Sequence, residues 1–404
     1  MHAPATLDGH LTYCLNIHPG ESWADVKAAV ATHGLAVKAL ISPDAPFGLG
    51  LRLAHGAVEE LRGSGEAAAW RDWLAEHGLY VFTVNGFPYG TFHGRSVKSA
   101  VYRPDWRTTE RLDYTLQLAG VLSELLPDGQ AGSISTVPGS YKAWLCGGDD
   151  ERQIARQLAA AAAALALLES RTQREIHLGL EPEPDCMLET TDETVQFFNQ
   201  RLIPEGVPAV CSLMGCTAAE AERLLRRHLG VCVDTCHLAI QGEDLAVSLT
   251  RLQSAGIRLS KLQLSAALKT PGPAAAAELE PFVDAVYLHQ VKAWNADGRR
   301  QAYPDLPEYL AACRNGSAPR GEARIHMHVP LDWGGDGTIQ TTADALTAAL
   351  REQVTRLERP HLEVETYTFN ILPPALRARP VEASLAAELR YALAWLRSGE
   401  RKPS

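Results

Sequence analysis

Short apolar segments alternate with longer segments of helical periodicity along most of the chain. The apolar segments lie at 11–18, 47–53, 80–87, 132–137, 176–183, 229–237 and 257–265, with a helical pattern between most of them. Strands that are connected through helices usually pair in parallel. Eight to ten strands in a chain of 404 residues therefore favour a closed (β/α)8 TIM barrel over an open doubly wound sheet.

The regular alternation changes in the last third of the chain. The turn sequence Asn295-Ala296-Asp297-Gly298 separates strand-like segments at 285–294 and 299–303, which predicts a β-hairpin. Further strands are expected at 324–330 and 361–368. We therefore expect a single TIM-barrel domain over residues 1–404, with an insertion at about 266–324. No GxGxxG motif follows the first strand, so no nucleotide cofactor is expected.

Polar residues occupy alternate positions within the apolar strands. Residues i and i+2 of a strand point to the same face. The polar faces are therefore expected to line the barrel, where their C-terminal ends form the mouth. The residues on these faces are Cys14, Asn16, His18, Thr83, Asn85, Glu181, Glu183, Lys261, Gln263, Ser265, His326, His328, His361, Glu363, Glu365 and Tyr367, with Asp234 at the end of its strand.

The acidic residues among them indicate a cation site. Glu181 and Glu183 end a buried strand, where two carboxylates are costly to desolvate. Without a cation, such a cluster would repel itself and its pKa values would rise.

Each of these residues also has a purely structural explanation. Asp234 can cap a helix, His289 can pack within the hairpin, and Glu363 can pair with Lys261. His326 and His328 can be hydrogen-bonded in a pocket wall. Taken together, the acids and histidines favour a site for a divalent metal.

Composition excludes several kinds of partner. The net charge of −10 and the pI of about 5.8 argue against nucleic acid, which needs a basic surface. No apolar run of about 18 residues predicts membrane insertion, and the N-terminus has no signal-peptide pattern. Eight cysteines without a CxxC pair indicate a reducing, cytoplasmic location.

Three segments carry a resemblance to a known family: Leu180-Glu181-Pro182, the segment 230–237 with its Asp234-Thr235-Cys236-His237 motif, and the segment 362–365. They resemble the xylose-isomerase-like TIM barrels, which include sugar epimerases, sugar-phosphate isomerases and endonuclease IV. The pattern of nearly the whole chain is most similar to the EboE-type metabolite traffic proteins of bacterial secondary-metabolite gene clusters.

The resemblance implies one divalent metal ion, held by Glu, Asp, His and Glu from strands five to eight. Matched by motif, the two glutamates fall on Glu181 and Glu365, with Glu363 as a rival to the latter, and the aspartate falls on Asp234. In the family, these two glutamates also act as acid and base.

The fourth metal ligand departs from the family pattern. The family's histidine aligns with Gln263, which could ligate weakly through its carbonyl oxygen. His289, His326 or His328 could supply the imidazole instead. The additional histidines of endonuclease IV correspond to Asn85 and Val137, so its trinuclear zinc site is not expected.

The resemblance implies an isomerase or epimerase of a small sugar, polyol or cyclitol, acting by enediolate proton transfer in an ebo-type pathway. The expected metal is Mn²⁺, Mg²⁺, Zn²⁺ or Co²⁺. Two alternatives remain: a non-catalytic metabolite carrier with a degenerate metal site, and a metal-dependent hydrolase or lyase. A homodimer is the base-rate expectation. The candidate substrate-binding residues are His18, Asn85, Glu183, His237, Lys261, His326, His328 and Glu363.

Overall fold

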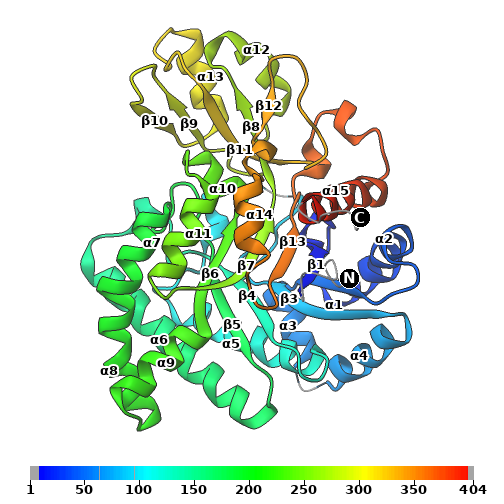
Figure 1. The fold of residues 1–404 in the computed structure, drawn as a ribbon, viewed down its shortest axis with the longest axis vertical. Helices are drawn as coiled ribbons and strands as arrows, with labels where there is room; N and C mark the ends of the chain where they lie inside the picture. Colours follow the sequence, from blue (N-terminus) through cyan, green and yellow to red (C-terminus); the bar gives the residue numbers. More distant parts are fainter. Residues whose placement is uncertain (1–8, 63, 95, 399–404) are drawn as a thin grey trace, which may run out of the picture.

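The computed structural model describes residues 9–62, 64–94 and 96–398. Eight parallel strands pair in the order β1-β13-β7-β6-β5-β4-β3-β2, and a bridge between Cys14 and Gly50 brings the two ends of the sheet together. The predicted TIM barrel is confirmed, and its helices lie outside the strands (Figure 1). The barrel strands are β1 (His10–Tyr13), β2 (Phe47–Arg52), β3 (Leu79–Asn85), β4 (Gly132–Thr136), β5 (Ile176–Leu180), β6 (Leu229–Asp234), β7 (Arg258–Leu264) and β13 (His361–Val364).

The helices around the barrel begin at the caps that the sequence provides. Ser22 and Thr190 each form a capping box with an acidic residue three positions later, which satisfies backbone N–H groups of the first turn. The helices are α1 (Trp23–Ala29), α2 (Leu35–Ile41), α3 (His55–Leu61), α4 (Glu66–Glu76), α5 (Thr109–Leu125), α6 (Gly148–Thr172), α7 (Thr191–Phe197), α8 (Ile203–Met214), α9 (Ala218–His228), α10 (Thr235–Ile240), α11 (Leu245–Ser254), α14 (Ala348–Val354) and α15 (Val381–Arg397).

Within the described ranges, no single helix has the length and apolar character needed to cross a membrane. The bent pair 191–214 and 218–228 meets these two criteria only when its helices are taken together, and it turns by 108°. Both parts of the pair lie against the long helix α6 on the outside of the barrel (Figure 1).

A second sheet is inserted between β7 and β13. Its five antiparallel strands have the order β10-β9-β11-β8-β12, and it lies at one end of the barrel (Figure 1). The pair β9–β10 is the predicted hairpin. The inserted sheet continues beyond residue 324, so His326 and His328 belong to it and not to the barrel wall. The inserted elements are β8 (Ala266–Thr270), α12 (Ala276–Leu279), β9 (Val291–Trp294), β10 (Arg300–Tyr303), α13 (Leu306–Arg314), β11 (Ala323–Val329) and β12 (Gln340–Thr341).

The inserted sheet joins the barrel without a linker. Only Ser265 separates the end of β7 from the start of β8. Strand β11 pairs with β8, and its last residue, Val329, lies opposite Ala266. The histidines of β11 are therefore held beside the C-terminal end of a barrel strand.

The barrel interior contains a closed ion pair. Lys261 Nζ on β7 lies 2.6 Å from Glu363 Oε2 on β13, and both side chains are fully buried. Gly50 on β2 leaves the space for this carboxylate, because a Cβ atom there would lie 1.8 Å from Glu363 Oε1. The pair offsets the cost of burying each charge.

We expect Lys261→Met alone to lower the free energy of unfolding by roughly 3–5 kcal/mol, because it leaves the buried carboxylate of Glu363 uncompensated. The double variant with Glu363→Leu should recover most of that loss. Urea unfolding of the wild type, both single variants and the double variant measures the coupling. Additive losses in the double variant would contradict the ion pair.

Helix α15 connects the two segments that follow β11 and β13. The Glu388 carboxylate on this helix accepts hydrogen bonds from Leu331 N at 3.0 Å and Thr366 Oγ1 at 2.7 Å. Burial raises the pKa of Glu388 to about 7, although these two hydrogen bonds act to lower it. Its protonation state therefore contributes to stability near neutral pH.

The folded-state pKa of Glu388 lies above its ordinary value of 4.5. The stability that protonation provides is therefore fully present below about pH 4.5 and is lost as the pH rises through about 7. Between about pH 4.5 and 7, we expect the ionisation of Glu388 to lower the unfolding free energy of the wild type by roughly 3 kcal/mol relative to the Glu388→Gln variant. Urea unfolding of both proteins over this range measures the difference. A pH-independent difference would exclude this role for Glu388.

Candidate metal centre

A narrow cavity opens at the C-terminal ends of the barrel strands. Its volume is about 50 Å³. The segment 86–106, whose many Gly, Pro and aromatic residues are typical of an active-site loop, contributes Phe87, Phe92 and Tyr102 to the wall. The polar side chains that line the cavity include Asn16, Asn85, Lys98, Glu181, Glu183, His237, His326 and Glu365.

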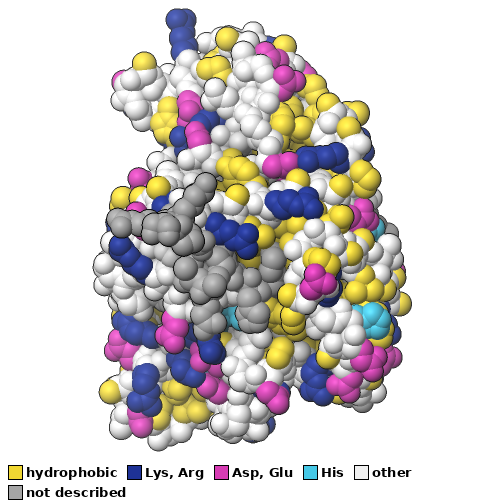
Figure 2. Space-filling model, turned by 45° about the vertical axis from the view of Figure 1, so that its right-hand side comes forward, with side chains coloured by type: hydrophobic (Ala, Val, Ile, Leu, Met, Phe, Trp, Pro, Cys, Tyr) yellow, Lys and Arg dark blue, Asp and Glu magenta, His cyan; other side chains and the backbone are white. Residues whose placement is uncertain are grey.

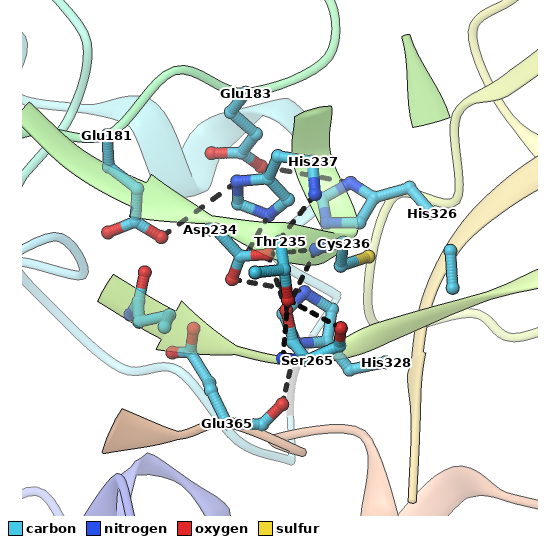
Figure 3. A network of polar contacts seen from close by, with 12 residues as sticks. Glu181, Glu183, Asp234, Thr235, Cys236, His237, Ser265, His326, His328 and Glu365 are labelled. Carbon is cyan, nitrogen blue, oxygen red and sulfur yellow. Dashed lines mark hydrogen bonds and ion pairs between the residues drawn. The ribbon is translucent and has the colours of Figure 1, made fainter. Parts of the chain in front are cut away.

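Three carboxylates from three different strand ends converge beside this cavity. Oxygen atoms of Glu181, Asp234 and Glu365 all lie within 4.8 Å of one another, and all three side chains are buried. Figure 3 shows them grouped together. Burial, followed by the charge of the neighbouring acids, raises the pKa values of Glu181 and Glu365 well above their usual range. The cluster therefore favours a bound cation.

Asp234 acts both as a helix cap and as a member of this cluster. Its Oδ1 atom accepts hydrogen bonds from Cys236 N at 2.7 Å, His237 N at 3.1 Å and Ser265 Oγ at 2.5 Å. Its buried Oδ2 atom has no hydrogen-bond partner among the described residues. The N-cap explanation and the ligand explanation thus apply to different oxygens of one carboxylate.

Two amides orient Glu365. Asn16 Nδ2 donates to Glu365 Oε1 at 2.6 Å, and Asn85 Nδ2 donates to the same oxygen at 3.1 Å. The buried Oε2 atom of Glu181 has no hydrogen-bond partner in the described part of the chain. Asn16 was not among the expected site residues, although its position between Cys14 and His18 on a polar strand face was a usable signal.

Three imidazoles complete the surroundings. Nδ1 of His237 lies 3.1 Å from Pro182 O, Nδ1 of His328 lies 2.9 Å from Glu365 O, and Nδ1 of His326 lies 2.8 Å from Gln290 Oε1. Each acceptor places the proton on Nδ1 and leaves the Nε2 lone pair available. Metal-binding histidines are typically oriented in this way.

His328 and His237 both lie beside Asp234. The Nε2 atom of His328 lies 3.9 Å from Asp234 Oδ2, and no hydrogen bond to this nitrogen is made within the described ranges. His237 Nε2 lies 4.0 Å from the same oxygen. Asp234 thus belongs to two groups of possible ligands, one with Glu181 and Glu365 and the other with His237 and His328. Carboxylate oxygens and imidazole nitrogens of this kind suit a divalent ion.

The other expected metal ligands have different surroundings. Gln263 Oε1 accepts a hydrogen bond from Cys232 Sγ at 3.1 Å. His289 Nδ1 donates to His326 O at 2.7 Å, and its Nε2 atom lies 3.6 Å from Asp284 Oδ2. Neither contact brings the residue into the carboxylate cluster.

Several expected substrate contacts are placed elsewhere. Lys261 and Glu363 are closed in their buried ion pair, as the structural explanation proposed. His18 packs between Tyr13, whose hydroxyl lies 3.1 Å from its Nε2 atom, and the stacked ring of His33. The expected contacts that do line the cavity are Asn85, Glu183, His237 and His326.

No family model matches the chain, and no curated protein matches it. Several solved structures are similar to the structure of this chain. The IolI protein with a bound zinc atom has a TM-score of 0.50 at 11% identity, covering 97% of this chain and 100% of that one. A probable 3-DHS dehydratase, AsbF from Bacillus anthracis, has a TM-score of 0.47 at 13% identity (95% and 98% covered). A xylose isomerase domain protein from Alicyclobacillus acidocaldarius has a TM-score of 0.41 at 12% identity, covering 96% of this chain and 98% of that one.

The chain therefore shares the TIM-barrel fold of the IolI protein. At these identities the likeness concerns the fold alone. The closer resemblance to the EboE-type group stays a prediction.

We expect Asp234→Asn and His328→Ala to weaken binding of the divalent ion by about 100-fold or more, because each removes a ligand. His289→Gln is the matched control, since it alters a buried histidine outside the cluster. Elemental analysis after dialysis measures the ion content. Loss of the ion from the His289 variant, with retention in the His328 variant, would reverse this assignment.

Proposed function

We propose that the protein is a metal-dependent isomerase or epimerase of a small sugar, polyol or cyclitol. The observation that carries this proposal is the pair Glu181 and Glu365. Their carboxylates come from different strands, lie within 4.8 Å of each other and face the same cavity beside Asp234. Two such groups can remove a proton from one carbon and return it to another carbon or another face.

Glu181, Asp234, His328 and Glu365 would hold the ion. When bound, the ion supplies Lewis-acid polarisation of a substrate carbonyl and stabilises the enediolate. Mn²⁺, Mg²⁺, Zn²⁺ and Co²⁺ all remain candidates, and the imidazole favours Zn²⁺, Co²⁺ or Mn²⁺ over Mg²⁺.

The surroundings of the two glutamates support different roles for them in this proposal. Burial and the neighbouring acids raise the pKa values of both glutamates, but Asn16 and Asn85 donate to Glu365 Oε1 and stabilise negative charge on Glu365 relative to Glu181. Glu365 is therefore the base that takes a proton from substrate carbon through its other oxygen. Glu181 Oε2 has no such donor among the described residues, so Glu181 returns the proton.

The cavity wall favours an uncharged substrate. Among the described residues, Lys98 is the one lysine or arginine that lines the cavity. Its Nζ atom donates to Asp284 O at 3.0 Å, Tyr287 O at 2.7 Å and Asp305 Oδ2 at 2.6 Å. This ammonium group is already engaged, and the neighbouring carboxylates repel anions. A polyol or cyclitol therefore fits better than a sugar phosphate.

Aromatic side chains exclude water from the reacting end of the cavity. The ring of Phe92 contacts those of Tyr287 and Tyr367, with centroids 5.2 and 5.5 Å away. Apolar walls with a few convergent polar groups are typical of small-molecule sites, and exclusion of water strengthens the electrostatic interactions inside.

The carrier alternative depended on a weakened ligand set at Gln263. His328 provides an imidazole near the carboxylates, which removes the reason to favour that alternative. An ebo-type pathway, an EboE-type relationship and a homodimer stay predictions.

The test is hydrogen exchange in D₂O. Protein loaded with Mn²⁺, Zn²⁺ or Co²⁺ is incubated with a panel of keto sugars and cyclitol ketones, and carbon-bound deuterium is followed by NMR. We expect exchange with at least one compound, and a loss of about 100-fold or more in Glu365→Gln, as for removal of a general base. The control is Glu205→Gln on the outer helix α8, which should keep full exchange.

Full exchange in the Glu365 variant would refute the assigned base. Loss of mass from the substrate without isomerisation would favour a lyase, and the absence of exchange from the whole panel would contradict the proposed reaction.

A further inference from the structure

A second cavity lies at the opposite end of the barrel from the metal centre. Its volume is about 750 Å³, and an adjoining cavity of about 470 Å³ shares part of its wall. The shared wall includes His177, Arg258 and His361, which lie at the N-terminal ends of β5, β7 and β13. This end of a TIM barrel normally contributes to stability, but here the cavity is of the size that binds small molecules.

His177 brings an unpaired polar atom to this cavity. The residue is only 3% exposed, and its buried Nδ1 atom has no hydrogen-bond partner in the described part of the chain. Burial, followed by the positive charge of Arg258, lowers the pKa of His177 well below its usual range, so the imidazole is neutral. Buried polar groups are rarely left unpaired, and a molecule in the cavity would pair with this one.

Arg258 supplies positive charge beside His177. Its Nη1 atom donates to Arg227 O at 2.7 Å and to the carboxylate of Glu175. Among the described residues, its Nε and Nη2 atoms donate to no other group. These two nitrogens form one edge of the guanidinium group, which can bind two oxygens of a single anion.

Most of the acidic side chains around the larger cavity are already neutralised. Arg227 pairs with both Glu169 and Glu175, and Arg174 pairs with Asp128. Glu358 is exposed to solvent. The acidic residues of this wall therefore leave the free edge of Arg258 available to a ligand. These acidic residues are Asp128, Glu169, Glu175 and Glu358.

His361 adds a hydrogen-bond acceptor next to His177, since the two ring centroids are 5.3 Å apart. Its Nδ1 atom lies 2.8 Å from Ser133 Oγ, and this hydroxyl donates its own hydrogen to Thr83 Oγ1 at 2.7 Å. Nδ1 of His361 therefore carries the proton, and Nε2 carries a lone pair. A ligand that contacts Nε2 has to donate an O–H group.

The outer surface gives an anion little general attraction. On the face shown in Figure 2, lysine and arginine side chains are intermixed with aspartate and glutamate. The whole chain carries a net charge of −10. Since the overall field repels anions, binding would depend on the specific groups of the cavity.

We propose that this cavity binds a small polyol that carries an oxyanion group, either a phosphate or a carboxylate. The oxyanion would accept hydrogen bonds from Arg258 and His177, and a hydroxyl group of the polyol would donate to His361. The ligand is an effector and not the substrate, because the cavity uses none of the residues at the mouth of the barrel. The inference therefore goes beyond the proposed function and does not depend on it.

The test measures binding of three related compounds to the full-length protein. Glycerol 3-phosphate, glycerate and glycerol are each titrated by calorimetry. We expect one saturable site per chain for at least one of the two anions and none for glycerol. Comparison of the two anions identifies the preferred oxyanion group. Arg258→Met and His177→Leu should each weaken binding by about 10-fold or more, because each removes a hydrogen bond to a charged group.

Two control variants should keep the wild-type affinity. Arg251→Gln removes an exposed arginine of α11 that pairs with Asp192, so it tests for a general effect of charge. Asp234→Asn alters the mouth of the barrel, so it tests for anion binding at the metal centre. Circular dichroism and thermal unfolding check that each variant folds. His177→Leu keeps the test valid if Arg258→Met does not fold.

Absence of saturable binding for both anions would overturn this inference, as would equal binding of glycerol. Loss of binding in Asp234→Asn, with retention in Arg258→Met or His177→Leu, would place the anion at the mouth and also reject the assigned site. Each of these results leaves the proposed function standing, because hydrogen exchange tests it separately.

Discussion

The structure depends on one electrostatic constraint: several carboxylates are buried inside a barrel that offers them few cations. One of them, Glu363, is neutralised by Lys261 deep in the lumen. The others lie one layer higher, where helix-terminal N–H groups, amides and imidazoles surround them. The lumen thus contains two layers: a buried ion pair that stabilises the barrel, and above it a group of carboxylates that forms no ion pair with a lysine or arginine among the described residues. Burial makes both layers costly to disrupt.

Much of the barrel could be predicted because its signals are local. Alternation of strands and helices, the period of two along each strand and the Asp234-Thr235-Cys236-His237 motif placed the carboxylates at the mouth. The size of the inserted sheet could not be predicted in this way, because its strands pair over long distances and its register depends on partners that the sequence does not mark. The hairpin was predictable from its turn residues alone.

The candidate site illustrates the same limit. Glu181, Asp234 and Glu365 follow from motifs, but His328 takes the place beside Asp234 because β11 pairs with β8 directly after β7. Alignment by strand number predicted Gln263 as the fourth metal ligand. Its side-chain oxygen instead accepts a hydrogen bond from Cys232. A rule that assigns one metal ligand to each barrel strand cannot predict an imidazole that comes from an inserted sheet. The role of Asn16 could have been predicted from its position on the polar face of the first strand.

The origin of these ligands along the chain has a consequence for folding. Glu181 follows the fifth barrel strand and Asp234 ends the sixth. His328 comes from the inserted sheet, and Glu365 follows the last barrel strand. An ion held by all four would act as a cross-link between the middle of the barrel, the insertion and the closing strand. The ion would then bind tightly only after the middle of the barrel, the insertion and the closing strand have all folded. The measured affinity for the metal would therefore report how completely the barrel has closed.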